Sequence, residues 1–291
     1  MILPNEILRS QNFIAQSDFW FAITALETSP AITPACRKVV QRSDVLADYV
    51  NLFDRDKLTP TSVVFCKIDY LEHLLKYINE KPNVSPFILL TGQSDYPITD
   101  GVYHIGFHVL GKNRLKWCGC NAETYMVTPI PLGIADDYCT LTVKSDFEKT
   151  KATKLLYVNH RVETFPQVRA PLYSLFSDKS WATVRTPDAK GETKSYKEEL
   201  LEHKFMLCPR GNGIDTHRMW EALYCGVIPV VQRHITHANL AGKLPILFVD
   251  SFEEVTEQLL YTTYESYKNR EWNEEMLTVS WWMNMMKVGL Q

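Results

Sequence analysis

From residue 154 to residue 261 the chain alternates between short apolar runs and segments whose apolar residues recur at helical spacing. Such alternation is typical of βα units, in which parallel strands lie side by side and helices cover the sheet. This half is therefore predicted to be a Rossmann-like domain, a fold that binds ligands at the carboxyl ends of its strands. The predicted strands are 154–159, 181–185, 205–208, 227–232 and 246–249, and the predicted helices are 167–176, 196–203, 216–225 and 252–261.

The first half of the chain carries similar signals, but less regularly. The polar and charged segment 136–154 separates the two halves. We therefore expect an α/β protein of two domains, residues 1–145 and residues 146–291, with the last helix packing back on the first domain. The predicted strands of the first half are 62–68, 86–91 and 126–129, and its predicted helix is 69–79.

Composition restricts the class of function. The 291 residues are 45% hydrophobic and 22% charged, with a net charge of −3. So small a charge provides no long-range attraction to nucleic acid or to an anionic membrane, and any phosphate must be held by a local site. The seven cysteines lie scattered in apolar segments, which indicates reduced thiols. Because the sequence shows neither a signal peptide nor a membrane span, we expect a cytoplasmic protein.

The segment CPRGNGIDTHRMWEAL, residues 208–223, is the strongest local motif. An apolar strand ends in Pro-Arg, a turn with two glycines follows, and a helix begins with Asp215 or Thr216 as its N-cap. The backbone N–H groups of such a turn and of a helix N-terminus attract anions. The motif is neither a GxxxxGK[ST] phosphate loop nor a GxGxxG dinucleotide fingerprint.

The polar side chains of this helix indicate which anion binds. Arg218 and Glu221 are three residues apart, and His217 and Glu221 four apart, so the three share one face that we expect to look outward. An arginine at a helix N-terminus opposes the macrodipole unless an anion lies between, and a diphosphate fits. Glu221 could then accept from the hydroxyls of a ribose. The alternative is an exposed Arg218–Glu221 ion pair. The predicted donor-binding residues are Arg210, Gly211, Asn212, Gly213, Asp215, His217, Arg218 and Glu221.

The segment HKFMLCPRGNGIDTHRMWEALYCGVIPVV resembles the signature of the exostosin-type, family 47-like glycosyltransferases. KLLYVNHRVETFPQVRAPLYSLF, VTPIPLGIAD and FILLTGQSDYPI are similar to further segments of that family, and the resemblance covers residues 86–232. It implies a GT-B fold, with two Rossmann-like domains facing a cleft, and inverting transfer from a nucleotide sugar. Family members usually carry a membrane anchor. No anchor is seen in this sequence, and in this respect it resembles the compact exostosin-like enzymes of large algal viruses, among them a xylosyltransferase.

Asp95 is the candidate general base. It follows the apolar run 86–91 and should lie at the carboxyl end of that strand. Inverting transfer needs a base within hydrogen-bond reach of the acceptor hydroxyl. The alternative reading is that Asp95 caps a turn before Pro97. His104 and His108 are weaker candidates, which we expect to be ordinary strand or loop residues.

Four other groups could bind a metal, but we expect none of them to do so. Asp54-Arg55-Asp56 matches the DxD motif of metal-dependent glycosyltransferases, a pattern that arises easily by chance. The remaining groups lack the number or spacing of ligands that a site requires, and they are Asp136 with Asp137, Cys118 with Cys120, and His234 with His237.

We therefore predict an inverting glycosyltransferase that moves a sugar from a nucleoside diphosphate donor to a glycan hydroxyl without a metal cofactor. The donor is expected to be UDP-linked, with UDP-xylose among the candidates, and the acceptor an oligosaccharide or glycoprotein. Two alternatives remain open. One is a non-catalytic carbohydrate- or nucleotide-binding module, and the other is a metal-dependent GT-A enzyme that uses Asp54 and Asp56.

Overall fold

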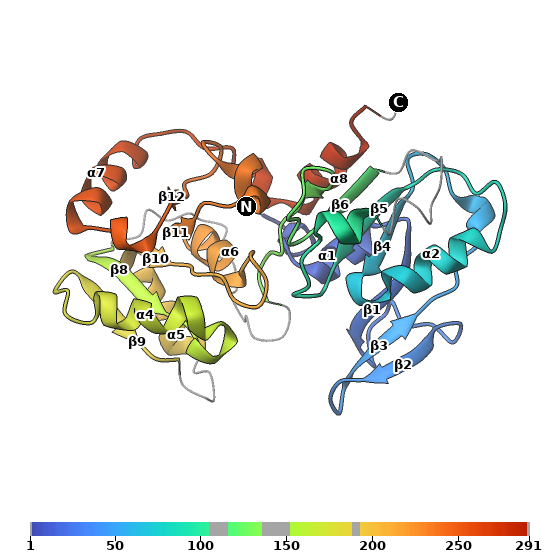
Figure 1. The fold of residues 1–291 in the computed structure, drawn as a ribbon, viewed down its shortest axis with the longest axis horizontal. Helices are drawn as coiled ribbons and strands as arrows, with labels where there is room; N and C mark the ends of the chain where they lie inside the picture. Colours follow the sequence, from blue (N-terminus) through green and yellow to red (C-terminus); the bar gives the residue numbers. More distant parts are fainter. Residues whose placement is uncertain (1, 105–115, 136–151, 188–192, 290–291) are drawn as a thin grey trace. The chain divides into compact units, whose positions relative to one another are not determined.

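The chain folds into two compact α/β units. Unit 1 comprises Met1–Arg9 and Gly133–Thr278, and unit 2 comprises Ser10–Leu132 and Val279–Gln291. Each unit contains one sheet flanked by helices (Figure 1). The predicted boundary after residue 145 lies outside the described residues. The computed structural model describes residues 2–104, 116–135, 152–187 and 193–289, without the side chains of 193–195.

Unit 1 contains a five-stranded sheet in the order β12-β11-β10-β8-β9, and every neighbouring pair is parallel. The predicted strands and helices of this half are all found, with ends that shift by up to six residues; the largest shift is in the helix predicted over 252–261, where a 3-10 turn precedes the α-helix. The strands are β8 (Lys154–Asn159), β9 (Ala182–Arg185), β10 (His203–Leu207), β11 (Ile228–Gln232) and β12 (Leu247–Val249). The helices are α4 (Pro166–Phe176), α5 (Thr193–Leu201), α6 (His217–Tyr224) and α7 (Glu257–Tyr267).

Helices cover both faces of this sheet. Successive strand residues point to opposite faces, so neighbouring residues of one strand contact different helices. Leu156 and Val158 of β8 pack in one core with residues of α4 and α7. Tyr157 lies between them in sequence, and its ring is 6.2 Å from that of Tyr196 in α5. The carboxyl ends of β8 and β10 therefore lie between helices of both layers.

The N-terminal residues belong to unit 1 and brace α6. The N–H of Leu8 donates to Tyr224 Oη at 2.7 Å, and Tyr224 donates in turn to the carbonyl of Leu277 at 2.6 Å. Leu8 also accepts from the N–H of Ile134 at 2.8 Å. Gly133 has φ 75°, and a Cβ there would lie 2.1 Å from the Leu8 carbonyl oxygen. Only glycine fits this position.

Unit 2 contains a seven-stranded sheet in the order β2-β3-β1-β4-β5-β6-β7. The five strands from β1 to β7 in this order are parallel, and β3 and β2 extend the sheet with antiparallel pairing. The predicted strands of this half are confirmed, whereas four strands carried no recognised signal. Those four are β1 (Phe19–Leu26), β2 (Arg37–Gln41), β3 (Leu46–Val50) and β6 (Lys116–Gly119), and the predicted three are β4 (Val63–Lys67), β5 (Ile88–Gly92) and β7 (Thr128–Pro129).

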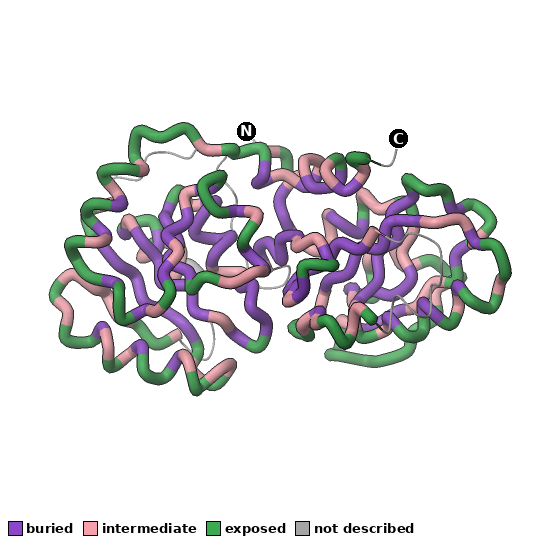
Figure 2. The backbone as a smooth tube through the Cα atoms, turned by 45° about the horizontal axis from the view of Figure 1, so that its top comes forward, coloured by how far each residue is buried: buried purple, intermediate pink, exposed green. Residues whose placement is uncertain are grey.

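Helices complete unit 2. The apolar face of α2 (Leu71–Asn79) packs on the sheet, and α8 (Val279–Lys287) packs against α1 (Ser10–Gln16). Lys116 Nζ donates to the carbonyl of Val288 at 3.2 Å, just past the end of α8, where a cation complements the helix dipole. Figure 2 shows the central strands of both sheets buried and most loops exposed.

No helix among the described residues combines the length and the apolar character needed to cross a membrane. The cysteines that the structure describes form no disulfide with one another, in agreement with the reduced thiols that the sequence predicts.

Candidate functional site

The predicted strand, turn and helix of residues 205–225 form as expected. β10 ends at Leu207, the N–H of Gly211 donates to the Gly213 carbonyl at 3.0 Å, and α6 begins at His217. Thr216 is the N-cap residue, and Gly226 follows the helix with φ 68°. This left-handed conformation is the common way for a helix to end at glycine.

Arg169 of α4, a residue that was not predicted, donates hydrogen bonds to the backbone of this turn. Its side chain is 3% exposed. Nε donates to the carbonyl of Arg210 at 2.7 Å, Nη2 to that of Pro209 at 3.2 Å, and Nη1 to that of Arg161 at 2.9 Å. A Cβ at Gly211 would lie 3.0 Å from Nη2, so glycine allows the turn to approach the guanidinium this closely.

Arg218, in the first turn of α6, lies beside Arg169. Its Nε donates to the carbonyl of Asn159, the last residue of β8, at 2.7 Å. Within the described ranges neither arginine has an ion pair, and the terminal nitrogens of Arg218 have no hydrogen bond. Burial, and secondarily the charge of Arg218, lowers the pKa of Arg169 to about 10. Among the described residues, the hydrogen-bond partners of these two guanidinium groups are thus neutral: backbone carbonyls and, for Arg169, also the hydroxyl of Thr164 at 3.0 Å.

Glu221 faces the protein interior, and the expectation that it looks outward is wrong. It is 8% exposed, because α5 covers it, and its Oε2 accepts from Tyr196 Oη at 2.8 Å. Burial and the neighbouring Glu221 carboxylate raise the pKa of Tyr196. The alternative Arg218–Glu221 ion pair is absent among the described residues.

The other predicted donor residues shape the turn. His217 Nδ1 donates to the carbonyl of Gly133 at 2.7 Å. Both carboxylate oxygens of the buried Asp215 accept from Trp220 Nε1, at 2.9 and 3.0 Å. The guanidinium of Arg210 lies 4.4 Å from the centre of the Phe165 ring and donates to the carbonyl of Asn212, an exposed residue.

His160, which follows β8 directly, is completely buried beside these arginines. Its Nε2 lies 3.1 Å from the carbonyl of Arg169 and therefore carries the proton. Nδ1 is then an acceptor, and it is buried without a hydrogen-bond partner. Burial, together with the charges of Arg218 and Arg169, lowers the pKa of His160 to about 4. Its position at the carboxyl end of a strand was the signal that could have identified it.

Asp95 lies in unit 2, in the loop that follows β5. It is exposed and comes three residues after the end of that strand at Gly92, as predicted. The loop begins with Gln93, whose Nε2 donates to the Thr24 carbonyl at 2.9 Å while its Oε1 accepts from the Thr24 N–H at 2.7 Å. His104 lies in a helical segment and is exposed. His108, Asp136 and Asp137 lie outside the described residues.

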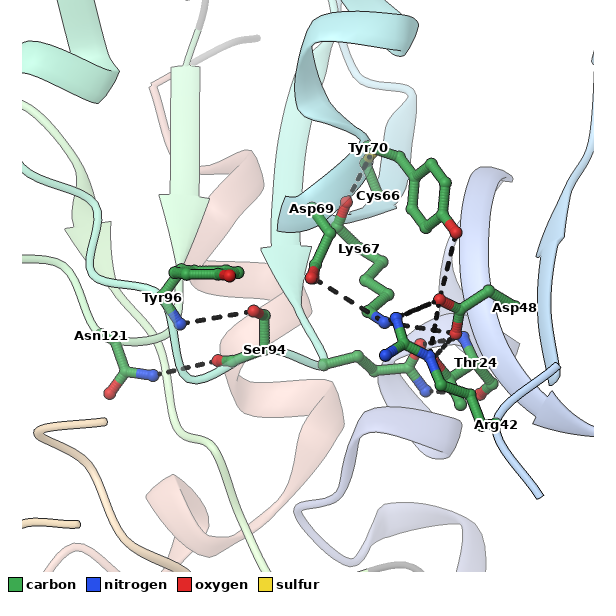
Figure 3. A network of polar contacts seen from close by, with 11 residues as sticks. Thr24, Arg42, Asp48, Cys66, Lys67, Asp69, Tyr70, Ser94, Tyr96 and Asn121 are labelled. Carbon is green, nitrogen blue, oxygen red and sulfur yellow. Dashed lines mark hydrogen bonds and ion pairs between the residues drawn. The ribbon is translucent and has the colours of Figure 1, made fainter. Parts of the chain in front are cut away.

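A polar network that was not predicted surrounds the buried Asp48 at the same edge of this sheet (Figure 3). Lys67 Nζ lies 3.2 and 3.0 Å from the two Asp48 oxygens, Arg42 Nε lies 2.9 Å away, and Tyr70 Oη lies 3.1 Å away. Thr24 Oγ1 also donates to Asp48. These donors outweigh the effect of burial and lower the pKa of Asp48 to about 2.

The rival metal ligands have other roles. Asp54 caps a 3-10 turn by accepting from the Asp56 N–H at 3.0 Å, and Asp56 pairs with Lys81. His237 is buried with its Nε2 3.5 Å from Asp215, and His234 accepts from Thr236 N–H at 3.3 Å. In the part of the chain that the structure describes, no three His, Cys, Asp or Glu side chains group as metal ligands would.

Comparison with known proteins supports the resemblance to exostosin-type enzymes. Residues 173–290 match the family model described as the RXYLT1 C-terminal domain, which is xylosyltransferase-related and exostosin-like. The match includes the glycine turn and α6. A search of curated proteins found no match. The family match does not bear on the predicted kinship with algal-virus enzymes. It does indicate that this region is similar to a glycosyltransferase domain.

Proposed function

We propose that the protein transfers a sugar from a nucleoside diphosphate donor to a glycan hydroxyl. The observation that carries this proposal is the pair Arg169 and Arg218, which lie beside the glycine turn and have carbonyl partners but no ion pair within the described residues. A buried cation without a counter-ion is costly unless a ligand supplies the charge. A diphosphate at the start of α6 would supply it.

In this proposal Arg218 binds the diphosphate through its two terminal nitrogens, while its Nε stays bonded to Asn159. The fork geometry of a guanidinium suits two phosphate oxygens at once. Arg169 keeps the turn in place and adds a second positive charge. Because these groups neutralise the diphosphate, the transfer needs no divalent cation. The xylosyltransferase-related match favours a UDP-linked pentose donor, UDP-xylose above all.

Glu221 is proposed to recognise the ribose. One of its oxygens accepts from Tyr196, and in the described residues the other, Oε1, accepts no hydrogen bond. Glu221 lies one turn beyond Arg218 on α6, so a ribose attached to a diphosphate at the helix start falls near it. Oε1 could then accept from a ribose hydroxyl.

The reaction proposed is a single displacement with inversion in a GT-B arrangement, with the donor on unit 1 and the acceptor on unit 2. The acceptor oxygen forms a bond to the anomeric carbon as the bond to the diphosphate oxygen breaks. Asp95 accepts the proton of the acceptor hydroxyl, and the nucleoside diphosphate leaves with the electron pair, next to Arg218. The exposure of Asp95 leaves it accessible to a substrate.

The donor site is tested by calorimetry with UDP on Glu221→Ala, with Tyr196→Phe as the matched control. We expect Glu221→Ala to weaken UDP binding 10–100-fold, since a charge-assisted hydrogen bond is worth about 1.5–3 kcal/mol. Tyr196→Phe should leave the affinity within about threefold, because it removes only the hydroxyl that orients Glu221. UDP affinity within twofold of wild type in Glu221→Ala would contradict the ribose role. An equal loss of UDP affinity in both variants would show that Glu221 contributes to binding only by way of its hydrogen bond with Tyr196.

The base is tested with Asp95→Asn, which preserves the shape but removes the proton acceptor. Turnover should fall roughly 10²–10⁴-fold, while the affinity for UDP should not change. A variant that turns over like the wild type would leave Asp95 as a turn residue. UDP binding without transfer to any acceptor in the wild type would favour the non-catalytic binding module.

A further inference from the structure

Two neighbouring loops of unit 2 leave the sheet at the same level and in the same unusual conformation. β5 and β6 are parallel, with Thr91 paired to Gly119. Two residues further along each strand stand Gln93, with φ 55°, and Asn121, with φ 54°. Left-handed backbone is uncommon at residues other than glycine, although asparagine adopts it more readily than glutamine, and it is concentrated at functional sites.

Hydrogen bonds then fasten the two loops to each other. The N–H of Ile98 donates to the Asn121 carbonyl at 2.9 Å, and the N–H of Glu123 donates to the Ile98 carbonyl at 2.9 Å. Asn121 Nδ2 donates to the carbonyl of Ser94 at 3.2 Å, as Figure 3 shows. Together with the bonds from Gln93 to β1, these contacts make the carboxyl edge of the sheet a preorganised surface.

This surface presents aromatic rings to solvent. Tyr96, in the β5 loop, is 65% exposed, and Tyr125, in the β6 loop, is 90% exposed. Met126, next to Tyr125, is 58% exposed. Large exposed apolar side chains on loops at the carboxyl ends of parallel strands, where α/β sheets bind ligands, indicate a binding surface.

The charges of the network around Asp48 cancel, so this network offers no net positive charge to a ligand. The polar network at this edge joins two cations, Lys67 and Arg42, and two carboxylates, Asp48 and Asp69, by ion pairs, with Lys67 and Asp48 buried. An anionic ligand would therefore find no unpaired cation in this network. A pyranose is neutral, has one apolar face of C–H groups and has hydroxyls at its rim. Tyrosine rings and the polar groups of Ser94 match those features.

We propose that Tyr96 and Tyr125 form a platform on which the sugar rings of a neutral glycan stack. The identification of this glycan as the acceptor rests on the proposed function, whereas its binding does not require transfer. Stacking places the C–H face of a pyranose on an aromatic ring and leaves its hydroxyls directed toward the solvent and toward Asp95, on the same loop as Tyr96.

The test is saturation-transfer NMR on the full chain without donor, with methyl β-D-glucopyranoside and xylotetraose as probes. We expect transfer to the axial H1, H3 and H5 protons, which form one face of the glucoside, and less to H2 and H4. In titrations with xylotetraose, Tyr96→Ala and Tyr125→Ala should each weaken binding roughly tenfold. Tyr261→Ala is the matched control, because Tyr261 is a 47% exposed tyrosine in unit 1, and it should leave binding unchanged.

Three outcomes would overturn the platform: no saturation transfer to either probe, equal transfer to both faces of the glucoside, or binding that survives in the Tyr96→Ala, Tyr125→Ala double variant. UDP affinity, measured on the same samples, separates this proposal from the donor site. UDP binding without glycan binding would contradict only the proposal of the platform. Glycan binding without UDP binding would leave the platform in place and remove the proposed transfer.

Discussion

The carboxyl edges of the two sheets compensate charge in opposite ways. In unit 2, Lys67 and Arg42 share one carboxylate, Asp48, whose oxygens also accept from two hydroxyls. In unit 1, Arg169 and Arg218 rest on backbone carbonyls and have no ion pair within the described residues. A carbonyl satisfies the hydrogen bond of a guanidinium but leaves most of its charge uncompensated.

The difference explains what each edge suits. Removing a charge from water costs several kcal/mol, which a protein recovers by pairing that charge internally or by binding a ligand of opposite charge. Unit 2 pairs its charges internally, so its edge suits a neutral molecule. Unit 1 leaves cations unpaired around a helix N-terminus, so its edge suits an anion. The predictions below test this contrast, beginning with the largest expected effect.

Removing the central carboxylate of unit 2 should be the most damaging change. Asp48→Ala leaves Lys67, which is 4% exposed, buried without its main counter-ion. We expect the free energy of unfolding of unit 2 to fall by about 3–5 kcal/mol. Urea denaturation, followed by hydrogen exchange in peptides from each unit, measures the loss separately. The double variant Asp48→Leu, Lys67→Met should recover part of it, because it leaves no buried charge in either position.

The matched change in unit 1 is Arg218→Ala. It removes a cation that lies near another cation, so unit 1 should lose less than about 1 kcal/mol in the absence of ligand. A loss as large as that from Asp48→Ala would show that the charge of Arg218 is compensated, and the contrast between the edges would fail.

The next largest effect is expected from acid, which should destabilise unit 1 at a higher pH than unit 2. The pKa of His160 is about 4 in folded unit 1, against an ordinary 6.5. Between these two pH values the unfolded chain is protonated at this residue and the folded chain is not. The stability of unit 1 is therefore fully present above pH 6.5 and is lost as pH falls toward 4, by about 2 kcal/mol at pH 5 from this residue alone. The pKa of Asp48 is about 2, against 3.8, so its contribution to unit 2 is present above pH 3.8 and is lost only below it.

Hydrogen exchange at pH 7 and pH 5, corrected for the intrinsic rate, checks this order. Peptides of unit 1 should lose protection first, and His160→Gln should reduce that loss. Equal loss of protection in both units, or an unchanged loss in the variant, would contradict the assignment to His160.

The contrast between the edges could be predicted from the sequence only in part. The strands and helices of unit 1 follow from βα alternation, and β8 begins and ends at the predicted residues. Arg218 was identified because it stands in a local motif, the glycine turn and the helix that follows, although its carbonyl partner, Asn159, is distant in the sequence. Arg169 was missed because its three carbonyl partners come from two other segments, which no spacing brings together.

Tertiary contacts also explain the remaining errors. The outward position predicted for Glu221 failed because α5 covers that face of α6, and helical spacing cannot show which neighbour covers a face. In unit 2, β2 is exposed along its whole length and so has no apolar alternation to reveal it. Asp48 lies alone between apolar residues of β3, and its partners come from four other places in the chain.

The smallest expected effect concerns the rival carboxylates Asp54 and Asp56. Their side chains are 52% and 69% exposed, and each pairs with a surface lysine, Lys57 and Lys81. Exposed pairs of this kind contribute about 0–1 kcal/mol, so Asp54→Asn with Asp56→Asn should change the unfolding free energy by no more than that. Because arginines of unit 1 are proposed to neutralise the diphosphate, transfer from a UDP-sugar should also stay within about twofold of wild type, with or without EDTA. Activity that disappears in EDTA, returns with manganese and is lost in the double variant would place the charge compensation on a metal at Asp54 and Asp56. In that case the unpaired arginines of unit 1 would have to be explained without a diphosphate, and the contrast between the two edges would lose its functional meaning.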